Sequence, residues 1–165
     1  MAKASRTERG FPMETPAPPT LDLVVHHIAI ICSDYVRSKA FYGDVLMFPL
    51  IRETYREARQ SWKGDFQVGA VQIELFSFPA SPLRPSYPEA QGLRHLAFGA
   101  AAFDAVCERL SGAGVILEPV RLDEATGRRF TFFTDPDGLP LELYETPPDN
   151  GSAATVGALL KLRPQ

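Results

Sequence analysis

The sequence predicts an α+β fold in which two βαβββ modules form a curved mixed sheet around a cleft. One observation behind this prediction is a constant offset of 68 residues, which carries His27 onto His95 and Glu74 onto Glu142 and matches HHIAI with RHLAF and IELFSFP with LELYETP. The other is that each half reads in the same order: a β-branched run, a helical segment and three shorter strand-like runs. A repeat of this kind indicates duplicated structural units.

The first module, about residues 23–78, begins with the strand-like run VVHHIAII at 24–31. A helix is predicted over 33–46, with Ser33 or Asp34 as its N-cap. One face of this helix is expected to be buried, formed by Tyr35, Ser38, Phe41, Tyr42 and Val45. Three strands are then predicted at 50–56, 61–69 and 70–78.

The second module, about residues 93–147, repeats this order after a strand around His95. Its helix is expected to bury one apolar face, formed by Phe103, Val106, Cys107 and Leu110. The helix should end at the small residues Ser111, Gly112 and Gly114. Strands follow at 115–121, 128–135 and 139–145, and the sequence DPDG at 135–138 predicts that the last two form a hairpin.

A proline-rich linker, residues 79–92, joins the modules. Such a segment stays extended at about 3.1 Å per residue and could span roughly 40 Å. It could therefore connect two modules that work together in one chain or pass one module to a partner subunit, and a homodimer is the expected assembly. Residues 1–20 and 148–165 are expected to be flexible flanking segments, with GALLKLR able to form a short helical turn.

Composition argues against several classes of partner. With 17 basic and 20 acidic residues and a formal charge of −3, the chain has no basic stripe for phosphates, so nucleic acid is not an expected partner. The polar N-terminus lacks the apolar segment of a signal peptide, and no run approaches the ~20 apolar residues of a membrane span. A soluble cytoplasmic protein is expected. Cys32 and Cys107 form no CxxC pair and are interpreted as buried apolar residues.

Four residues on the repeated strands are candidate metal ligands: His27, Glu74, His95 and Glu142. If the first and fourth strands of a module are neighbours, the His and Glu of that module lie side by side on one sheet face. Pairing the modules about a pseudo-twofold axis would then join two imidazoles and two carboxylates, a set that suits one catalytic divalent ion with open positions. A single His on a strand is more often a core residue with satisfied ring nitrogens. Two glutamates within apolar strands, however, need counter-charges, and a metal supplies them.

From about Val24 to Glu145 the chain resembles the vicinal oxygen chelate superfamily, and within it glyoxalase I (lactoylglutathione lyase). The resemblance is carried by HHIAIICSD, SKAFYGDVLMF, VQIELF, GLRHLAF and above all FFTDPDGLPLELYE. It implies the glyoxalase/bleomycin resistance/dihydroxybiphenyl dioxygenase fold. It also implies one divalent ion per site, which would be nickel, cobalt or zinc, with manganese or iron as further candidates. The ligands implied are His27, Glu74, His95 and Glu142.

The function implied by the resemblance is that of a metal-dependent lyase or isomerase, which transfers a proton on a small α-oxygenated substrate with Glu142 as base and Glu74 as second choice. Bacterial glyoxalase I enzymes hold the carboxylates of glutathione with an Arg and an Asn, each four residues after a metal ligand. This chain has Ile31 and Phe78 there, so the glutathione hemithioacetal is not expected to be an efficient substrate. The alternative is a non-catalytic module that sequesters a small molecule in the cleft.

The segment REARQSWKGD carries three basic residues around Trp62, namely Arg56, Arg59 and Lys63. They could hold an anionic substrate against an aromatic wall, but a solvated hairpin is the favoured interpretation. Arg128 and Arg129 are interpreted in the same way. His26 should point away from the face of His27, and we interpret it as structural or as a support for the ligands.

Overall fold

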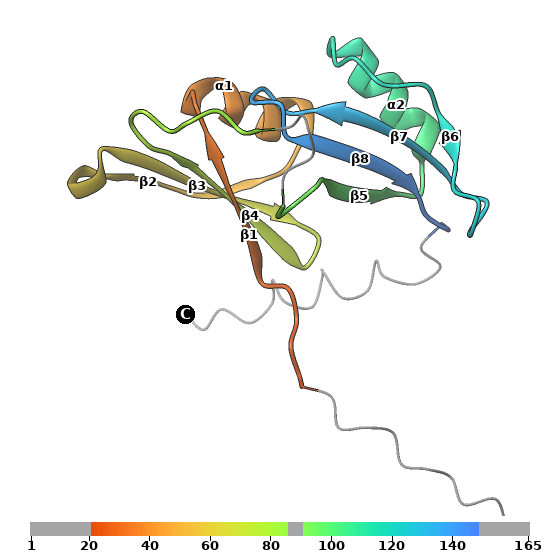
Figure 1. The fold of residues 1–165 in the computed structure, drawn as a ribbon, viewed down its shortest axis with the longest axis horizontal. Helices are drawn as coiled ribbons and strands as arrows, with labels where there is room; N and C mark the ends of the chain where they lie inside the picture. Colours follow the sequence, from red (N-terminus) through yellow and green to blue (C-terminus); the bar gives the residue numbers. More distant parts are fainter. Residues whose placement is uncertain (1–20, 86–90, 149–165) are drawn as a thin grey trace, which may run out of the picture.

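The computed structural model describes residues 21–85 and 91–148, which form two four-stranded mixed sheets (Figure 1). The first sheet has the order β1-β4-β3-β2, with strands β1 (His27–Cys32), β2 (Leu50–Arg56), β3 (Ser61–Val68) and β4 (Val71–Ser77). The second has the order β5-β8-β7-β6, with strands β5 (Leu96–Ala100), β6 (Arg121–Leu122), β7 (Arg129–Thr134) and β8 (Pro140–Glu145). In each sheet the first and last strands pair in parallel and the others pair antiparallel. The predicted α+β fold of two βαβββ modules is thus confirmed.

The helix predicted over 33–46 is shorter and divided into two parts. Helix α1 (Tyr35–Ala40) begins at Asp34, whose side chain accepts a hydrogen bond from the Arg37 backbone N–H at 3.0 Å. Asp34 is therefore the N-cap, while Ser33 bonds to the other module. From Phe41 to Val45 the chain forms a π-helix, η1. In the second module, helix α2 (Phe103–Gly112) lies where it was predicted.

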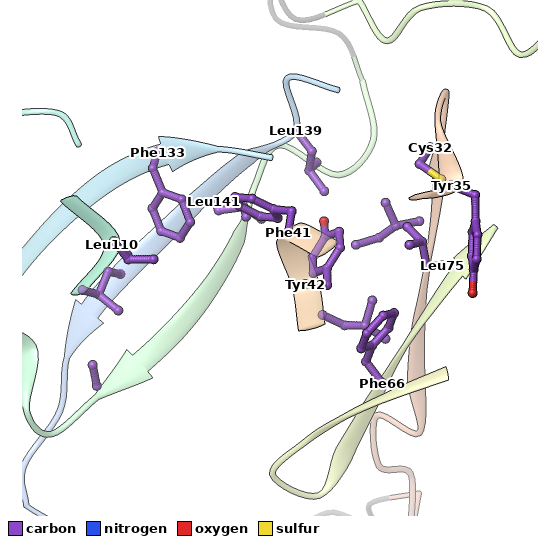
Figure 2. Close-up of a cluster of buried hydrophobic side chains, with 14 of the residues drawn as sticks. Cys32, Tyr35, Phe41, Tyr42, Phe66, Leu75, Leu110, Phe133, Leu139 and Leu141 are labelled. Carbon is purple, nitrogen blue, oxygen red and sulfur yellow. The ribbon is translucent and has the colours of Figure 1, made fainter. Parts of the chain in front are cut away.

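Aromatic side chains of η1 fill the space between the two sheets (Figure 2). Phe41 and Tyr42 lie between a cluster that includes Leu75 and a cluster that includes Leu141. These side chains are at most 9% exposed. The predicted helical face is thus buried as expected, and it packs against both modules. One continuous core therefore fixes the modules side by side.

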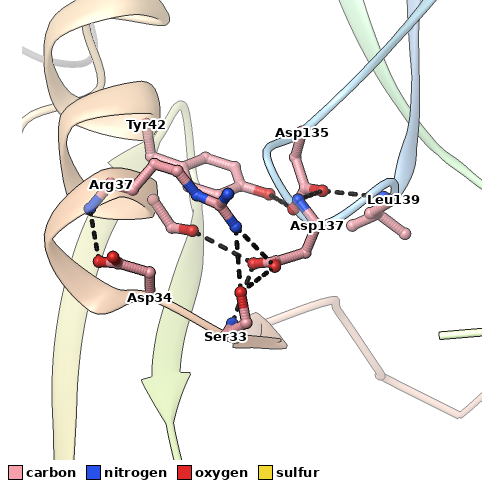
Figure 3. A network of polar contacts seen from close by, with 8 residues as sticks. Ser33, Asp34, Arg37, Tyr42, Asp135, Asp137 and Leu139 are labelled. Carbon is pink, nitrogen blue, oxygen red and sulfur yellow. Dashed lines mark hydrogen bonds and ion pairs between the residues drawn. The ribbon is translucent and has the colours of Figure 1, made fainter. Parts of the chain in front are cut away.

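A polar network links the DPDG turn of the second module to helix α1 (Figure 3). Asp137 accepts hydrogen bonds from the Ser33 backbone N–H at 3.0 Å, from the Ser33 hydroxyl and from Arg37 at 2.9 Å. Beneath it, the hydroxyl of Tyr42 donates to Asp135 at 3.0 Å. The turn that joins β7 to β8 is thereby attached to the first module. The hairpin predicted from DPDG is confirmed, with Gly138 at φ 80°.

Two strand predictions were too long. Residues 24–26 precede β1, whose register with β4 begins at His27 opposite Gln72, and Val24 and Val25 are exposed. Of residues 115–121 only Arg121 belongs to a strand, because Pro119 has no N–H to donate to a ladder. The expectations for residues 1–20 and 149–165, GALLKLR included, lie outside the described residues. In the part that is described, no helix is long and apolar enough to cross a membrane.

Candidate metal centre

The His–Glu pair of the first module lies on the sheet face opposite the core. Strands β1 and β4 are parallel neighbours, with Ala29 opposite Glu74 in the register. His27, two residues before Ala29, therefore shares the face of Glu74. Its Nε2 lies 3.8 Å from Oε2 of Glu74, and the two side chains are 44% and 16% exposed. The pair is open to solvent on the histidine side.

The second module repeats this arrangement more tightly. Strands β5 and β8 are parallel neighbours, with Ala97 opposite Glu142. Nε2 of His95 lies 2.9 Å from Oε2 of Glu142, and the side chains are 28% and 12% exposed. Each module thus presents one imidazole nitrogen and one carboxylate oxygen at the same place on its sheet. We call these two pairs the first and second half-sites.

The half-sites do not meet within one chain. Among residues 21–85 and 91–148, no three His, Cys, Asp or Glu side chains lie close enough together to hold a metal ion. The shared core around Phe41 and Tyr42 sets the two sheets beside each other (Figure 1). Each half-site therefore stays on its own partly open face. The two His–Glu pairs therefore do not converge on one point within the described part of the chain.

The first half-site contains two further charged residues, Lys63 and Asp65. The sequence analysis placed Lys63 in a solvated hairpin as its favoured interpretation and missed Asp65. Nζ of Lys63 donates to Oε1 of Glu74 at 2.8 Å and lies 2.9 Å from Oδ1 of Asp65. Asp65 is only 5% exposed, directly opposite Glu74 in the β3–β4 register. The favoured interpretation of Lys63 as part of a solvated hairpin was therefore wrong. The strict alternation of polar and apolar residues in SWKGDFQ could have shown that Lys63 and Asp65 share one face.

The matching wall of the second half-site is aromatic. Phe132 lies opposite Glu142 in the register and Phe130 lies opposite Tyr144, so they take the places of Asp65 and Lys63. The ring of His95 meets Phe132 edge to face, with centroids 5.2 Å apart. The two half-sites thus share their ligands but differ in their walls.

Other residues singled out in the sequence have more ordinary surroundings. Trp62 lies on the opposite face of β3, stacked on Tyr35 with centroids 5.5 Å apart. Arg129 pairs with Asp104 and Glu145, both at 2.8 Å, and so has a structural role. Ile31 is 56% exposed and Phe78 stacks on Phe76, so the apolar surface expected beside the ligands is present.

The histidines suit metal ligation better than a core role. A core histidine normally has both ring nitrogens satisfied, but Nδ1 of His95 is buried with no hydrogen-bond partner in the described part of the chain. Nδ1 of His27 lies 2.9 Å from Nδ1 of His26, which leaves Nε2 directed at Glu74. A neighbour that holds one ring nitrogen typically orients the other toward a metal. Two imidazoles and two carboxylates fit a borderline divalent ion.

The family model of the Glyoxalase/Bleomycin resistance protein/Dioxygenase superfamily matches residues 24–143. The chain belongs to this superfamily. Among its members, the protein YaeR of Escherichia coli is 62% identical over 122 residues, which cover 73% of this chain and 95% of YaeR. A glyoxalase family protein from Enterococcus faecalis has a solved structure that is 46% identical, with a TM-score of 0.70, covering 74% of this chain and 97% of that one.

More distant members of the superfamily have names that state an activity or a ligand. A 2-epi-5-epi-valiolone epimerase from an Actinomyces species is 27% identical over 147 residues, which cover 76% of this chain and 80% of the epimerase. The fosfomycin resistance protein FosX from Listeria monocytogenes shares the fold at 20% identity and a TM-score of 0.58. It covers 77% of this chain and 94% of FosX, and its structure is of a complex with Mn(II) and sulfate. Proteins that resemble this chain in sequence or in fold thus include an epimerase and a protein solved with a bound divalent ion.

Proposed function

We propose that this protein is a divalent-metal-dependent lyase or isomerase that moves a proton on a small α-oxygenated molecule. The observation that carries the proposal is the duplicated His–Glu pair, which places one imidazole nitrogen and one carboxylate oxygen at equivalent points of two sheets. His27, Glu74, His95 and Glu142 would hold the ion. An epimerase and a manganese-binding protein among its relatives agree with this proposal.

The complete site would form across a homodimer. Because the half-sites lie apart within one chain, the first module of one subunit would face the second module of its partner. The surface leading into the first half-site suits such a contact, since Leu23, Val24 and Val25 before β1 are 62–85% exposed. Large exposed apolar patches commonly mark contact surfaces. A divalent ion between the half-sites would supply Lewis-acid polarisation of the substrate oxygens.

Glu74 and Glu142 have different surroundings, and we assign them different roles. Glu74 already accepts a hydrogen bond from Lys63 on Oε1 and turns Oε2 toward His27, which suits a fixed ligand. Glu142 has no lysine or arginine partner among the described residues, and its ion pair there is with His95 at 2.9 Å. Glu142 is therefore our choice for the group that takes the proton from one carbon and returns it to the next. Phe130 and Phe132 beside it would exclude water from that transfer.

Metal analysis of paired variants tests the site and its dimeric construction together. His27→Ala and His95→Ala homodimers should each lose the metal, while wild type retains one ion per subunit. A heterodimer of one His27→Ala and one His95→Ala chain, purified through two different tags, should regain one ion per dimer. In that heterodimer one site would combine the intact first half-site of one chain with the intact second half-site of the other.

The outcomes separate the alternatives. A heterodimer without metal places the site within one chain, and a wild-type protein that folds normally without retaining metal rejects the metal-dependent function. Arg59→Ala is the control and should keep its metal, because Arg59 is an exposed residue of the turn between β2 and β3 and belongs to neither half-site. The methylglyoxal–glutathione adduct should be turned over feebly, since Ile31 and Phe78 offer no charge to its carboxylates. Efficient turnover would show that these two residues do not decide the substrate.

A further inference from the structure

The first half-site carries more positive charge than ligand binding explains. We propose that Lys63 and Arg56 form an anion-binding wall beside it, so that the substrate is an α-oxygenated molecule with a second, distal carboxylate or phosphate group. This inference rests on the proposed function, because it describes the substrate of that same site.

Both cations lie on the ligand-bearing face of the first sheet. In the register Lys63 is opposite Phe76, and Arg56 is opposite Ser61, two residues before Lys63 on the same face. Nζ of Lys63 lies 5.6 Å from the centroid of the Phe76 ring, and Cζ of Arg56 lies 5.5 Å from the same centroid. Phe76 follows Glu74 by two residues on β4, so the two cations lie at the edge of the half-site.

Lys63 is not needed merely to balance a ligand glutamate. The second half-site has a glutamate at the equivalent position, Glu142, and carries Phe130 where the first carries Lys63. The extra lysine comes with its own buried carboxylate, Asp65, 2.9 Å away. Burying such a pair costs desolvation energy, and an apolar pair of the kind in the second module avoids that cost. The charged pair therefore points to a role in recognition.

The charges around the half-site leave a positive excess. Two glutamates would balance a divalent ion, and Asp65 balances Lys63. Arg56 forms no ion pair with any carboxylate of residues 21–85 and 91–148, and its guanidinium rests on an aromatic ring instead. A guanidinium and an ammonium on one wall suit carboxylate or phosphate oxygens, through hydrogen bonds to charged groups.

Matched pairs of probes test this inference on the full-length, manganese-loaded protein. 2-Oxobutyrate and 2-oxoglutarate offer the same α-oxo acid and differ by a distal carboxylate. Dihydroxyacetone and its phosphate offer the same α-hydroxyketone and differ by a distal phosphate. In isothermal titration, at least one of the two probes with a distal anionic group should bind with an affinity about 10- to 100-fold higher than that of its partner. This ratio is the range expected for a hydrogen bond to a charged group. Tighter binding in the first pair would indicate that the wall binds a carboxylate, and tighter binding in the second pair would indicate that it binds a phosphate.

Variants of Lys63 and Arg56 test whether these two residues cause the tighter binding of the probe with the distal anionic group. Arg56→Met should reduce this preference to about twofold or less while the metal content stays unchanged. For Lys63 the variant is the double substitution Lys63→Met with Asp65→Asn, which leaves no unpaired buried carboxylate; Lys63→Arg should keep the preference. The matched control is Arg59→Met, an exposed arginine of the same segment outside the half-site.

Each result bears on one proposal. Full metal content with equal binding of both members of each pair, or with no binding of either probe that carries a distal carboxylate or phosphate, overturns the anion wall and leaves the metal site standing. A preference that survives Arg56→Met and the double variant also overturns it. If the protein retains no metal, the proposed function fails. The same titrations on the metal-free protein then test the anion wall alone. A preference for the distal anionic group that is lost in Arg56→Met supports the wall, and the lack of any such preference in the wild-type protein overturns it.

Discussion

The hydroxyl of Tyr42 is the point at which the two modules share a buried hydrogen bond, and Tyr42→Phe removes it. The hydroxyl donates to Oδ2 of Asp135 at 3.0 Å, and both residues are at most 4% exposed. The other oxygen of Asp135 accepts from the backbone N–H groups of Asp137 and Leu139 at 2.9 and 2.8 Å. In the variant Oδ2 would lose its donor with no access to water. A hydrogen bond to a buried charged group is worth about 1.5–3 kcal/mol, so the free energy of unfolding should fall by about 2 kcal/mol at pH 8.

The loss of unfolding free energy in Tyr42→Phe should depend on pH. Burial raises the pKa of Asp135, and the Tyr42 hydroxyl opposes that rise because it stabilises the carboxylate. Since the folded carboxyl holds its proton more tightly than the unfolded one, Asp135 makes the fold less stable as the pH rises above its ordinary pKa of 3.8. Removing the hydroxyl raises the folded pKa further. The cost of Tyr42→Phe should therefore be largest at pH 8 and shrink as the pH is lowered toward 4.5.

Urea unfolding at pH 8 and pH 4.5 and at one protein concentration measures this effect. Tyr55→Phe is the control, because Tyr55 is 46% exposed and should lose almost nothing. A double-mutant cycle with Asp135→Asn isolates the pair. A cost below about 0.5 kcal/mol at pH 8, or an equal cost at both pH values, would refute the reasoning.

Three further expectations follow from burial and charge. Gly64→Ala should destabilise the fold by about 1–3 kcal/mol in urea unfolding, because a Cβ there would lie 2.5 Å from the Tyr35 hydroxyl; an unchanged midpoint would contradict this. Cys32 should react with Ellman's reagent at pH 8 only after unfolding, because burial raises its pKa to about 11 and leaves it 1% exposed; rapid labelling of the native protein would count against it. Glu145→Gln should destabilise the protein at neutral pH but not at pH 2, because the hydrogen bonds from Arg129 lower the pKa of Glu145 to about 2 and its stabilisation disappears as the pH falls from about 4.5 to 2. A pH-independent effect in urea titrations would show that the charge of this pair is irrelevant.

The repeat made most of the fold predictable. Because His27 and Glu74 recur as His95 and Glu142, the strand assignments of one half supported those of the other. The pairing of the first and fourth strands of each module was only a condition at that point, and the structure shows these strands as parallel neighbours. The π-helix from Phe41 was not predictable, because its backbone follows from the need to insert two aromatic rings between the sheets.

The charged residues Lys63 and Arg56 were given only a less favoured role beside the site, for a different physical reason. In REARQSWKGD the charges are dense enough to look like a solvated turn, and density alone does not reveal burial. The decisive information is the register that places Asp65 opposite Glu74, which is a property of two strands and not of one segment. That the two His–Glu pairs lie apart within one chain was equally hidden, because it depends on how the two sheets pack.

Duplication gave the two modules the same ligands, and their walls then became different. The proposed metal binding would constrain the His and the Glu of each half-site, whereas the neighbouring positions would be free to change. Lys63 and Asp65 occupy in the first module the positions of Phe130 and Phe132 in the second. If the proposed site closes these faces on one ion, it would have a charged side and an aromatic side, and a substrate with an acidic end would enter it in one orientation only. In that orientation the reacting carbons would lie toward Glu142, the glutamate without a lysine partner among the described residues and the proposed base.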